Sequence, residues 1–320
     1  MRVLVTGGSG YIGSHVVKEL FDSGHQVVIL DDMSLGVAEN IDDRADFIRG
    51  SILNRSDLDQ ALAGGVEAIF HFAAFKAAGE SMLNPAKYAT TNLGGTISLL
   101  NAALDHGVPN FIFSSSAAIY GFPEYLPVDE SHPLRPANFY GYTKLEIERL
   151  LEWYGQLQGL RFAALRYFNA AGYDVQGRIH GRERNPANLL PLVLEVAAGI
   201  RPRLQVFGDD YATRDGTGVR DYIHVNDLAG AHLLALDYLH THPDNLVLNL
   251  ATGVGYSVLE VIAMARQVSG RPIEYEIVGR RPGDPAELYA VSPIAAEKLG
   301  WQPCYSDLET LLRSMWEIYK

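Results

Sequence analysis

Short apolar runs alternate with longer amphipathic runs through the first half of the chain. The apolar runs are uniform rather than alternating, which is typical of strands buried on both faces of a parallel sheet. The predicted strands are Val3–Thr6, Gln26–Asp31, Phe47–Arg49, Ala68–Phe72, Asn110–Ser114 and Phe162–Arg166. The predicted helices are Ile12–Asp22, Ser56–Ala63, Pro85–His106 and Phe139–Gln158. Such alternation predicts an α/β fold with a doubly wound parallel sheet.

This regularity ends after about Asn169, where a Gly- and Arg-rich loop at Gly172–Pro186 precedes a helix that begins near Asn188. Further predicted strands are Leu204–Phe207, Asp221–His224 and Leu246–Leu250, and a polar loop at Gly208–Gly218 separates the first two. A helix is predicted at Asp227–Leu239, and the segments Ser257–Val268 and Ile273–Val278 and a final helix from Asp307 complete the chain. We expect residues 1–170, with 224–251 returning to them, to form one domain. Residues 171–320 would form a smaller, discontinuous mixed α/β domain that closes a cleft at the carboxyl ends of the strands.

Composition narrows the function classes. Apolar residues make up 48% and charged residues 20% of the 320 residues, as in ordinary globular proteins. The net charge of −12 argues against nonspecific nucleic-acid binding, which needs a basic face. Cys304 is the single cysteine, so no intrachain disulfide can form. No signal-peptide pattern and no apolar run long enough for a bilayer are present, so we expect a cytoplasmic protein without a membrane partner.

Glycines at the first strand–helix junction point to a dinucleotide. Gly7, Gly10 and Gly13 follow the first strand and open the first helix. Such a turn lets backbone approach a pyrophosphate at a helix N-terminus, although glycine-rich turns alone also serve structural roles. Asp31 ends the second strand, where an acidic residue binds the adenosine ribose and repels a 2′-phosphate. The sequence therefore predicts a Rossmann-type domain that binds NAD rather than NADP.

A candidate catalytic pair opens a later helix. Tyr140 and Lys144 are four residues apart, which places them on one helix face, and Ser114–Ser116 end a buried strand. Tyr142 competes with Tyr140 but lacks the four-residue spacing. Such a Ser–Tyr–Lys set can remove a proton from an alcohol as hydride leaves the same carbon. A tyrosine pKa of about 7 would need roughly 4 kcal/mol from nearby positive charge.

The chain resembles the extended short-chain dehydrogenase/reductase superfamily and, within it, the UDP-glucose 4-epimerases. The resemblance covers essentially the whole chain. Its motifs are Val5–His15, His71–Ala73, Lys76–Ser81, Phe111–Ser116, Leu165–Asn169, Asn188–Pro191 and the highly specific block Asp215–Val225.

The resemblance implies a role for each matching residue. Tyr140 would be the acid/base, Lys144 its electrostatic partner and nicotinamide-ribose ligand, and Ser116 a hydrogen-bond partner of the reacting sugar oxygen. Implied NAD contacts are Tyr11, Ile12, Asp31, Phe72, Lys76 and Phe168. Implied UDP-sugar contacts are Lys76, Asn169, Asn188, Leu189, Phe207, Arg220, Arg281, Asp284 and Leu288. Arg220 and Arg281 have the chemistry to pair with diphosphate oxygens that a protein of net charge −12 would otherwise repel.

Other reactions of the superfamily place different demands on the site. The related 4,6-dehydratases carry Asp-Glu after the serine, whereas Ala117 and Ala118 stand here, and methyl groups cannot shuttle protons. We therefore expect this chain to be an epimerase that interconverts UDP-galactose and UDP-glucose through a 4-keto sugar. UDP-N-acetylhexosamine or UDP-uronate epimerases, a dehydrogenase that releases NADH and a non-catalytic NAD-binding protein stay open as alternatives.

Three positions depart from the family pattern. Ser51 and Val291 stand where Asp is frequent, and Leu288 occupies the position that gates the C2 substituent of the sugar. A large Tyr at that position accompanies glucose and galactose, and a small residue accompanies N-acetylated sugars, so Leu288 leaves acceptance of the latter open. The resemblance also implies a homodimer through the helices Pro85–His106 and Phe139–Gln158. No metal site is predicted.

Overall fold

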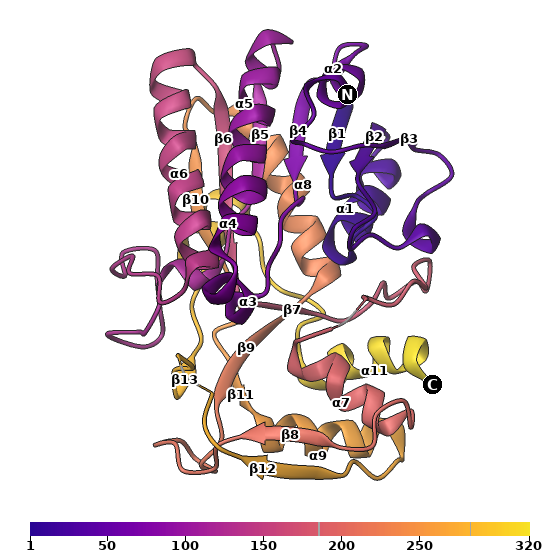
Figure 1. Cartoon of the computed structure of the whole chain (residues 1–320), viewed down its shortest axis with the longest axis vertical. Coiled ribbons are helices and arrows are strands. Elements are labelled where there is room, and N and C mark those ends of the chain that lie inside the picture. Colours follow the sequence, from indigo (N-terminus) through magenta and orange to yellow (C-terminus); the bar gives the residue numbers. More distant parts are fainter. Residues whose placement is uncertain (185, 282) are drawn as a thin grey trace.

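A parallel sheet forms the centre of the computed structural model (Figure 1), which describes residues 1–184, 186–281 and 283–320. Within these residues the sheet has seven strands in the order β10-β6-β5-β4-β1-β2-β3. The strands are β1 (Arg2–Thr6), β2 (Gln26–Asp31), β3 (Asp46–Arg49), β4 (Ala68–His71), β5 (Asn110–Ser114), β6 (Arg161–Tyr167) and β10 (Leu246–Leu250). Successive strands are added on one side of β1 up to β3 and on the other side from β4 onward. Such sheets bind ligands at this point, between the carboxyl ends of β1 and β4. The predicted doubly wound α/β sheet is confirmed.

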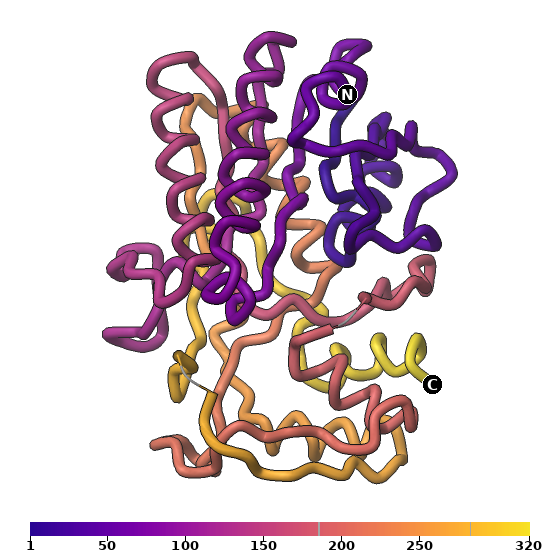
Figure 2. The backbone as a smooth tube through the Cα atoms, in the orientation of Figure 1, coloured from indigo at the N-terminus to yellow at the C-terminus, as the bar shows by residue number. Residues whose placement is uncertain are grey.

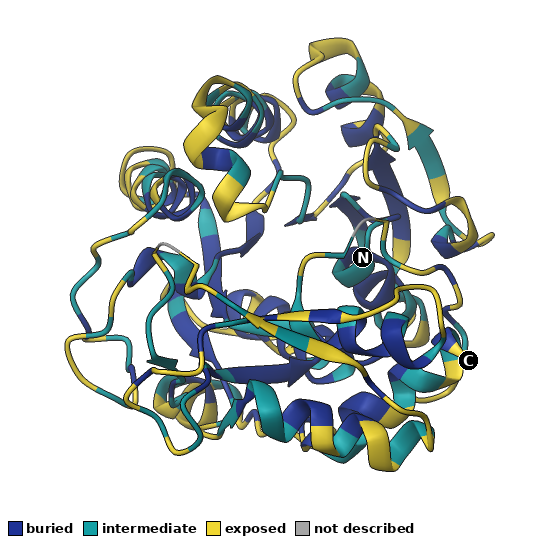
Figure 3. Ribbon diagram, turned by 60° about the horizontal axis from the view of Figure 1, so that its bottom comes forward, coloured by how far each residue is buried: buried dark blue, intermediate teal, exposed yellow. Residues whose placement is uncertain are grey.

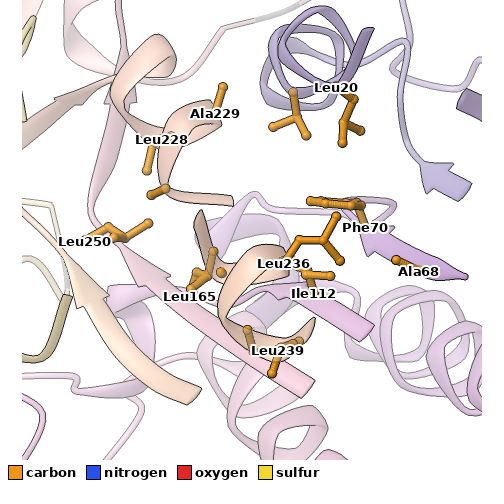
Figure 4. Packing of buried hydrophobic residues seen from close by; sticks show 14 of the residues in the cluster. Leu20, Ala68, Phe70, Ile112, Leu165, Leu228, Ala229, Leu236, Leu239 and Leu250 are labelled. Carbon is orange, nitrogen blue, oxygen red and sulfur yellow. The ribbon is translucent and has the colours of Figure 1, made fainter. Parts of the chain in front are cut away.

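Helices cover both faces of this sheet because alternate strand residues point to opposite sides. Val5 and Phe70 join one apolar cluster with Leu20 and Leu236 of the covering helices, as Figure 4 shows for three of them. Leu4 joins the cluster on the other face. The first face carries α1 (Tyr11–Asp22) and α8 (Val225–Thr241), and the second carries α2 (Arg55–Leu62), α5 (Gly95–Asp105) and α6 (Phe139–Gln158). The uniform apolar runs in the sequence follow from this two-sided burial.

A smaller region lies beyond the carboxyl ends of the strands, in the lower half of Figures 1 and 2. Its strands are β7 (Asn169–Ala171), β8 (Leu204–Phe207), β9 (Val219–His224), β11 (Gly255–Ser257), β12 (Tyr275–Val278) and β13 (Glu287–Leu288). Its helices α7 (Leu189–Ala197), α9 (Val258–Ser269) and α11 (Leu308–Tyr319) share an apolar cluster, and their inward sides are the buried ones in Figure 3. The helix α10 (Pro293–Leu299) instead packs against α8. The predicted domain limits stay a prediction.

The helix predicted over Pro85–His106 is confirmed, and it contains an irregular turn. The segment consists of α4 (Pro85–Tyr88), a π-helical stretch at Ala89–Gly94 and then α5, and a short α3 (Ala78–Leu83) precedes it. Asn92 in the π stretch bonds both backbone groups of Phe75, at 3.0 Å each, and so ties the wide turn to the segment after β4. Apolar spacing does not reveal a single wide turn, although π turns occur often at functional sites.

The short strands β7, β11 and β13 were not predicted from the sequence. Each has three residues or fewer and exists because it pairs with β9, so the alternation it carries is too brief to be recognised. In the described ranges, no helix combines the length and apolarity needed to cross a membrane.

Candidate active site

The turn between β1 and α1 has no room for side chains at two of its glycines. Gly7 has a φ of +73°, and a Cβ there would lie 2.7 Å from the backbone nitrogen of Ala73. A Cβ on Gly13 would lie 2.3 Å from the carbonyl oxygen of Gly7. Gly10 caps α1, whose first amides have no partner within the helix and carry its partial positive charge. The turn thus offers bare backbone donors to an anion, which fits the pyrophosphate of a dinucleotide.

Asp31 lies beside this turn at the end of β2. Its carboxylate accepts hydrogen bonds from the backbone N–H of Ser9, at 3.1 Å, and of Met33, at 2.9 Å. These bonds fix the carboxylate next to the glycine turn, at the edge of the sheet where the sequence predicted a ribose contact. After β3, the hydroxyl of Ser51 accepts a bond from the backbone of Leu53 at 3.2 Å, so this departure from the family pattern stabilises a turn.

Two caps set the start of α6, where Tyr140 lies. Asn138 accepts a bond from the N–H of Gly141 at 2.9 Å, and Ser81 of α3 accepts one from the N–H of Tyr140 at 3.0 Å. A Cβ on Gly141 would lie 2.4 Å from the carbonyl oxygen of Ala118, so the helix approaches the segment after β5 closely. That approach brings the phenol of Tyr140 close enough to the hydroxyl of Ser116 for Ser116 to lower the pKa of the phenol.

Lys144 lies one turn further along the same face of α6. Its ammonium donates a 2.6 Å hydrogen bond to the carbonyl of Ser114 and lies 5.8 Å from the ring centre of Tyr140. The side chain is buried, and burial lowers the pKa of Lys144 to about 7, while the carboxylate of Glu148 opposes that shift. Lys144 therefore changes charge near neutral pH.

The pKa of Tyr140 is raised in the protein alone, whereas the lowered pKa expected from the sequence counted both Lys144 and the cationic nicotinamide. Burial raises the pKa of Tyr140, and the hydrogen bond from Ser116 offsets this effect in part. Desolvation disfavours the phenolate more than the neighbouring groups of the chain favour it. The positive charge that makes Tyr140 a base at neutral pH must therefore include charge brought by a bound ligand.

The segment after β4 carries Phe72 and Lys76. Phe72 directly follows the strand, and its ring centre lies 5.0 Å from that of His232 in α8. The exposed ammonium of Lys76 forms an ion pair with Glu183, which comes from the region between β7 and α7. Lys76 is therefore joined to the second region rather than to Tyr140. The predicted loop Gly172–Pro186 includes residue 185, which lies outside the described residues.

Charged and aromatic side chains gather on the short strands of the second region. The guanidinium carbon of Arg281 lies 4.3 Å from the ring centre of Phe207, at the end of β8. Nη2 of Arg220 on β9 lies 3.7 Å from Oδ1 of Asp284. Leu288 on β13 is the partner of Arg220 in the pairing of β13 with β9. The structure thus brings these five predicted substrate residues to one group of short strands.

The remaining predicted residues lie between the two ends. Phe168 and Leu288 pack on an apolar cluster that contains Ala117, the residue after Ser116. The side chain of Asn169 donates to the carbonyl of Asp221 at 2.8 Å. Asn188 caps α7 and lines a pocket together with Tyr11, whereas the neighbouring Leu189 packs against the core of the second region. Ile12 follows Tyr11 in the first turn of α1.

Several residues of this site were missed in the sequence. Asn138 carried a recognisable signal, since Asn before a helical run is a frequent cap. Ser81 and Asn92 act through contacts between distant segments. Glu183 pairs with Lys76, from which it is separated by 107 positions in the chain. Among the described residues, no group of three or more His, Cys, Asp or Glu is arranged to hold a metal ion.

Comparison with known proteins gives the family of the chain. Residues 3–251 match the sequence profile of the NAD dependent epimerase/dehydratase family. The chain belongs to this family. A UDP-glucose 4-epimerase from Halalkalibacterium halodurans is 47% identical over 322 residues, which cover 100% of this chain and 96% of the relative. The resemblance stated from the sequence is confirmed.

Solved structures agree over the whole chain. UDP-glucose 4-epimerase from Brucella ovis, in complex with NAD, has a TM-score of 0.96 and 44% identity, covering 99% of this chain and 98% of that chain. UDP-glucose-4-epimerase from Stenotrophomonas maltophila, with bound NAD and formylated UDP-arabinopyranose, has a TM-score of 0.95 and 42% identity, covering 100% and 98%. Both similarities extend from the central sheet through the second region.

Proposed function

We propose that this protein is an NAD-dependent isomerase that interconverts UDP-galactose and UDP-glucose at C4 of the hexose. The observation that carries the proposal is that Ser116, Tyr140 and Lys144 come together at the carboxyl edge of the sheet, the edge that also carries the glycine turn. Ala117 and Ala118 follow the serine, so the site lacks the carboxylates that a dehydratase uses at these two positions. Membership of the epimerase/dehydratase family supports the same reaction class.

NAD fits the residues at the first strand–helix turn. The backbone of Gly7, Gly10 and Gly13 would hold the pyrophosphate, and Asp31 the adenosine ribose. The other residues assigned to the cofactor are Tyr11, Ile12, Phe72, Lys76, Phe168, Tyr140 and Lys144. When bound, NAD accepts and returns a hydride, which amino-acid side chains cannot do.

The side chains of the site handle the proton. Tyr140 takes the proton of the 4-hydroxyl, which Ser116 orients, and later returns it to the oxygen on the inverted carbon. The ammonium of Lys144, close to the ring of Tyr140, favours the phenolate that does this. The same phenol serves both directions, so the reaction is reversible and consumes no net oxidant.

The second region holds the UDP group while the sugar turns. Arg220 and Arg281 pair with the diphosphate, and Phe207 offers its ring to the base. The remaining assigned substrate contacts are Lys76, Ser116, Tyr140, Asn169, Asn188, Leu189, Asp284 and Leu288. In this proposal residues 1–170 with 224–251 carry the cofactor, and residues 171–320 supply the UDP-sugar domain.

One incubation tests the proposal. Purified protein is mixed with UDP-galactose without added cofactor, and the sugars and the absorbance of reduced nicotinamide are followed together. We expect UDP-glucose to appear without accumulation of NADH, because the hydride is returned within each turnover. Stoichiometric NADH release would indicate a dehydrogenase instead. Bound NAD without conversion of UDP-galactose, UDP-N-acetylgalactosamine or a UDP-uronate would indicate a non-catalytic NAD-binding protein.

Leu288 is expected to set the tolerance for substituents at C2. Its side chain packs on the cluster next to Ser116, so a larger group there narrows the space around the reacting sugar. We expect Leu288→Tyr to lower turnover of UDP-N-acetylgalactosamine about tenfold or more relative to turnover of UDP-galactose. The measurement is kcat/KM for both sugars. Ile277→Tyr, at an exposed position on β12, is the control for adding a tyrosine. Equal loss with both sugars would contradict this role.

We propose a homodimer formed through α5 and α6. Ile97 of α5 and Trp153 and Leu157 of α6 are exposed apolar side chains, with Trp153 60% and Leu157 68% exposed. Trp153 and Leu157 are four residues apart and so share a helix face. We expect Trp153→Glu combined with Leu157→Glu to convert the dimer to a monomer in light scattering. Ile277→Glu, a charge placed on another exposed strand, should leave the mass unchanged. A wild-type monomer would refute the proposed assembly.

A further inference from the structure

A buried ion pair lies behind the catalytic face of α6. The carboxylate of Glu148 accepts hydrogen bonds from Nε and Nη2 of Arg166, at 3.0 and 2.7 Å. The hydroxyl of Ser115 donates to the same carboxylate. The side chains of Glu148 and Arg166 are 4% and 6% exposed, so the pair is shielded from water. Glu148 thus links α6 to β6 and to the residue after β5.

The pair continues into a chain of hydrogen bonds beneath the site. Nη1 of Arg166 donates to the hydroxyl of Tyr120 at 3.1 Å, and that hydroxyl donates to the side chain of Asn249 on β10 at 2.6 Å. Each polar group in this chain is therefore satisfied, which makes the network rigid. The network connects α6 to three neighbouring strand ends and to the short helix that Ser116 begins.

The position of Ser115 gives this network access to the catalytic groups. Ser114 precedes it and accepts the hydrogen bond from Lys144, and Ser116, which lowers the pKa of Tyr140, follows it. Glu148 lies one helical turn beyond Lys144. A buried ion pair is weak evidence for stability, because apolar residues of similar volume often stabilise as well. The geometry therefore calls for a second role.

We infer that Glu148 is a positioning residue for the reaction. Through Ser115 its carboxylate fixes the backbone that carries Ser116 and the carbonyl of Ser114, and it places a negative charge one turn from the ammonium of Lys144. The inference rests on the proposed roles of Ser116, Tyr140 and Lys144. Glu148 acts through these residues and does not contact the sugar.

The surrounding groups decide the sign of the electrostatic effect. The groups that act on Lys144 directly are Tyr140 and Glu148 on α6 and His71 on β4. Behind them, Arg166 contacts Glu148 and Tyr120, Tyr167 lies near Tyr140, and Glu130 lies near Tyr120. Burial lowers the pKa of His71 to about 3, so it is neutral at the pH of the reaction. Glu148 raises the pKa of Lys144 against its burial. Removing the carboxylate charge therefore lowers the pKa of Lys144.

The decisive variant removes both charges of the pair. In Glu148→Gln with Arg166→Met no charge is left unpaired, so we expect folding stability close to that of the wild type in thermal unfolding. The ammonium of Lys144 is needed for the phenolate, so activity is present below the pKa of Lys144 and is lost as pH rises through it. Of the two charges, only the Glu148 carboxylate shifts the pKa of Lys144, so its loss decides the sign. We expect kcat to fall about tenfold and its alkaline limb to move to lower pH. KM for UDP-galactose should stay unchanged, because the network does not reach the UDP contacts.

A matched pair on the same helix is the control. Glu146 and Arg149 form a 2.6 Å ion pair nearer the surface of α6, and Glu146→Gln with Arg149→Met should keep the wild-type kcat, KM and pH profile. A wild-type pH profile and kcat in the folded Glu148/Arg166 variant would overturn the inference. If that variant does not fold, Ser115→Ala tests the same link, with a severalfold lower kcat expected and an unchanged kcat overturning it. Absence of wild-type turnover would instead refute the proposed function.

Discussion

Replacing Tyr140 by phenylalanine is expected to lower kcat by about a thousandfold while bound NAD is retained. The substitution removes the one hydroxyl that meets Ser116 and leaves the ring in its buried place. The proton of the 4-hydroxyl then has no acceptor in the site, whereas the glycine turn that would hold the cofactor is untouched. The measurement is single-turnover and steady-state kinetics with UDP-galactose, with bound NAD quantified after denaturation.

Tyr142 supplies the matched control for this experiment. It lies two residues further along α6 with 42% of its surface exposed, so Tyr142→Phe should leave kcat within about twofold of the wild type. A loss confined to the Tyr142 variant would move the acid/base role to that residue. Comparable activity in both variants would show that neither phenol transfers the proton.

A single methyl group added at Gly13 is expected to abolish NAD retention and, as a result, to lower kcat at least about a hundredfold. The added Cβ would lie 2.3 Å from the carbonyl oxygen of Gly7, which is backbone and cannot turn aside as a side chain can. The turn must then open, and the first helix moves away from the strand that precedes it. Purified Gly13→Ala should therefore release little or no NAD on denaturation, and added NAD should restore only a small part of the turnover.

Gly230→Ala is the corresponding control in α8. Among the described atoms a Cβ there would meet nothing within 4 Å, and alanine is favoured over glycine within a helix by about 1 kcal/mol. We expect this variant to bind NAD normally and to unfold at a slightly higher temperature. Normal NAD content in Gly13→Ala would show that the turn tolerates a side chain, and the assignment of the pyrophosphate to it would fail.

The parallel sheet and its helices were predictable because local pattern and global fold agree there. The apolar runs near Val5 and Phe70 are buried on both faces, so their sequence signal is strong. The glycine turn and the spacing of Tyr140 and Lys144 are also local features. They predict where the cofactor end and the catalytic end of the candidate site lie.

The rest of the site depends on contacts that no local pattern carries. The strand β13 has two residues and exists through its pairing with β9, so the place of Leu288 could be given only by resemblance. The ion pair of Lys76 with Glu183 and the π turn at Asn92 likewise arise from segments distant in the chain. The raised pKa of Tyr140 follows from burial, which is a property of the assembled fold.

The return of β10 to the central sheet has a consequence for biosynthesis. Strand β6 pairs with β5 on one side and with β10 on the other, and β7, α7, β8 and β9 of the second region are made before β10. A ribosome-bound chain that ends before Leu246 therefore presents β6 as an open, apolar edge. Such edges recruit other strands, so the nascent protein needs protection until residue 250 has emerged. The part of the second region that precedes β10 thus delays the closure of the central sheet.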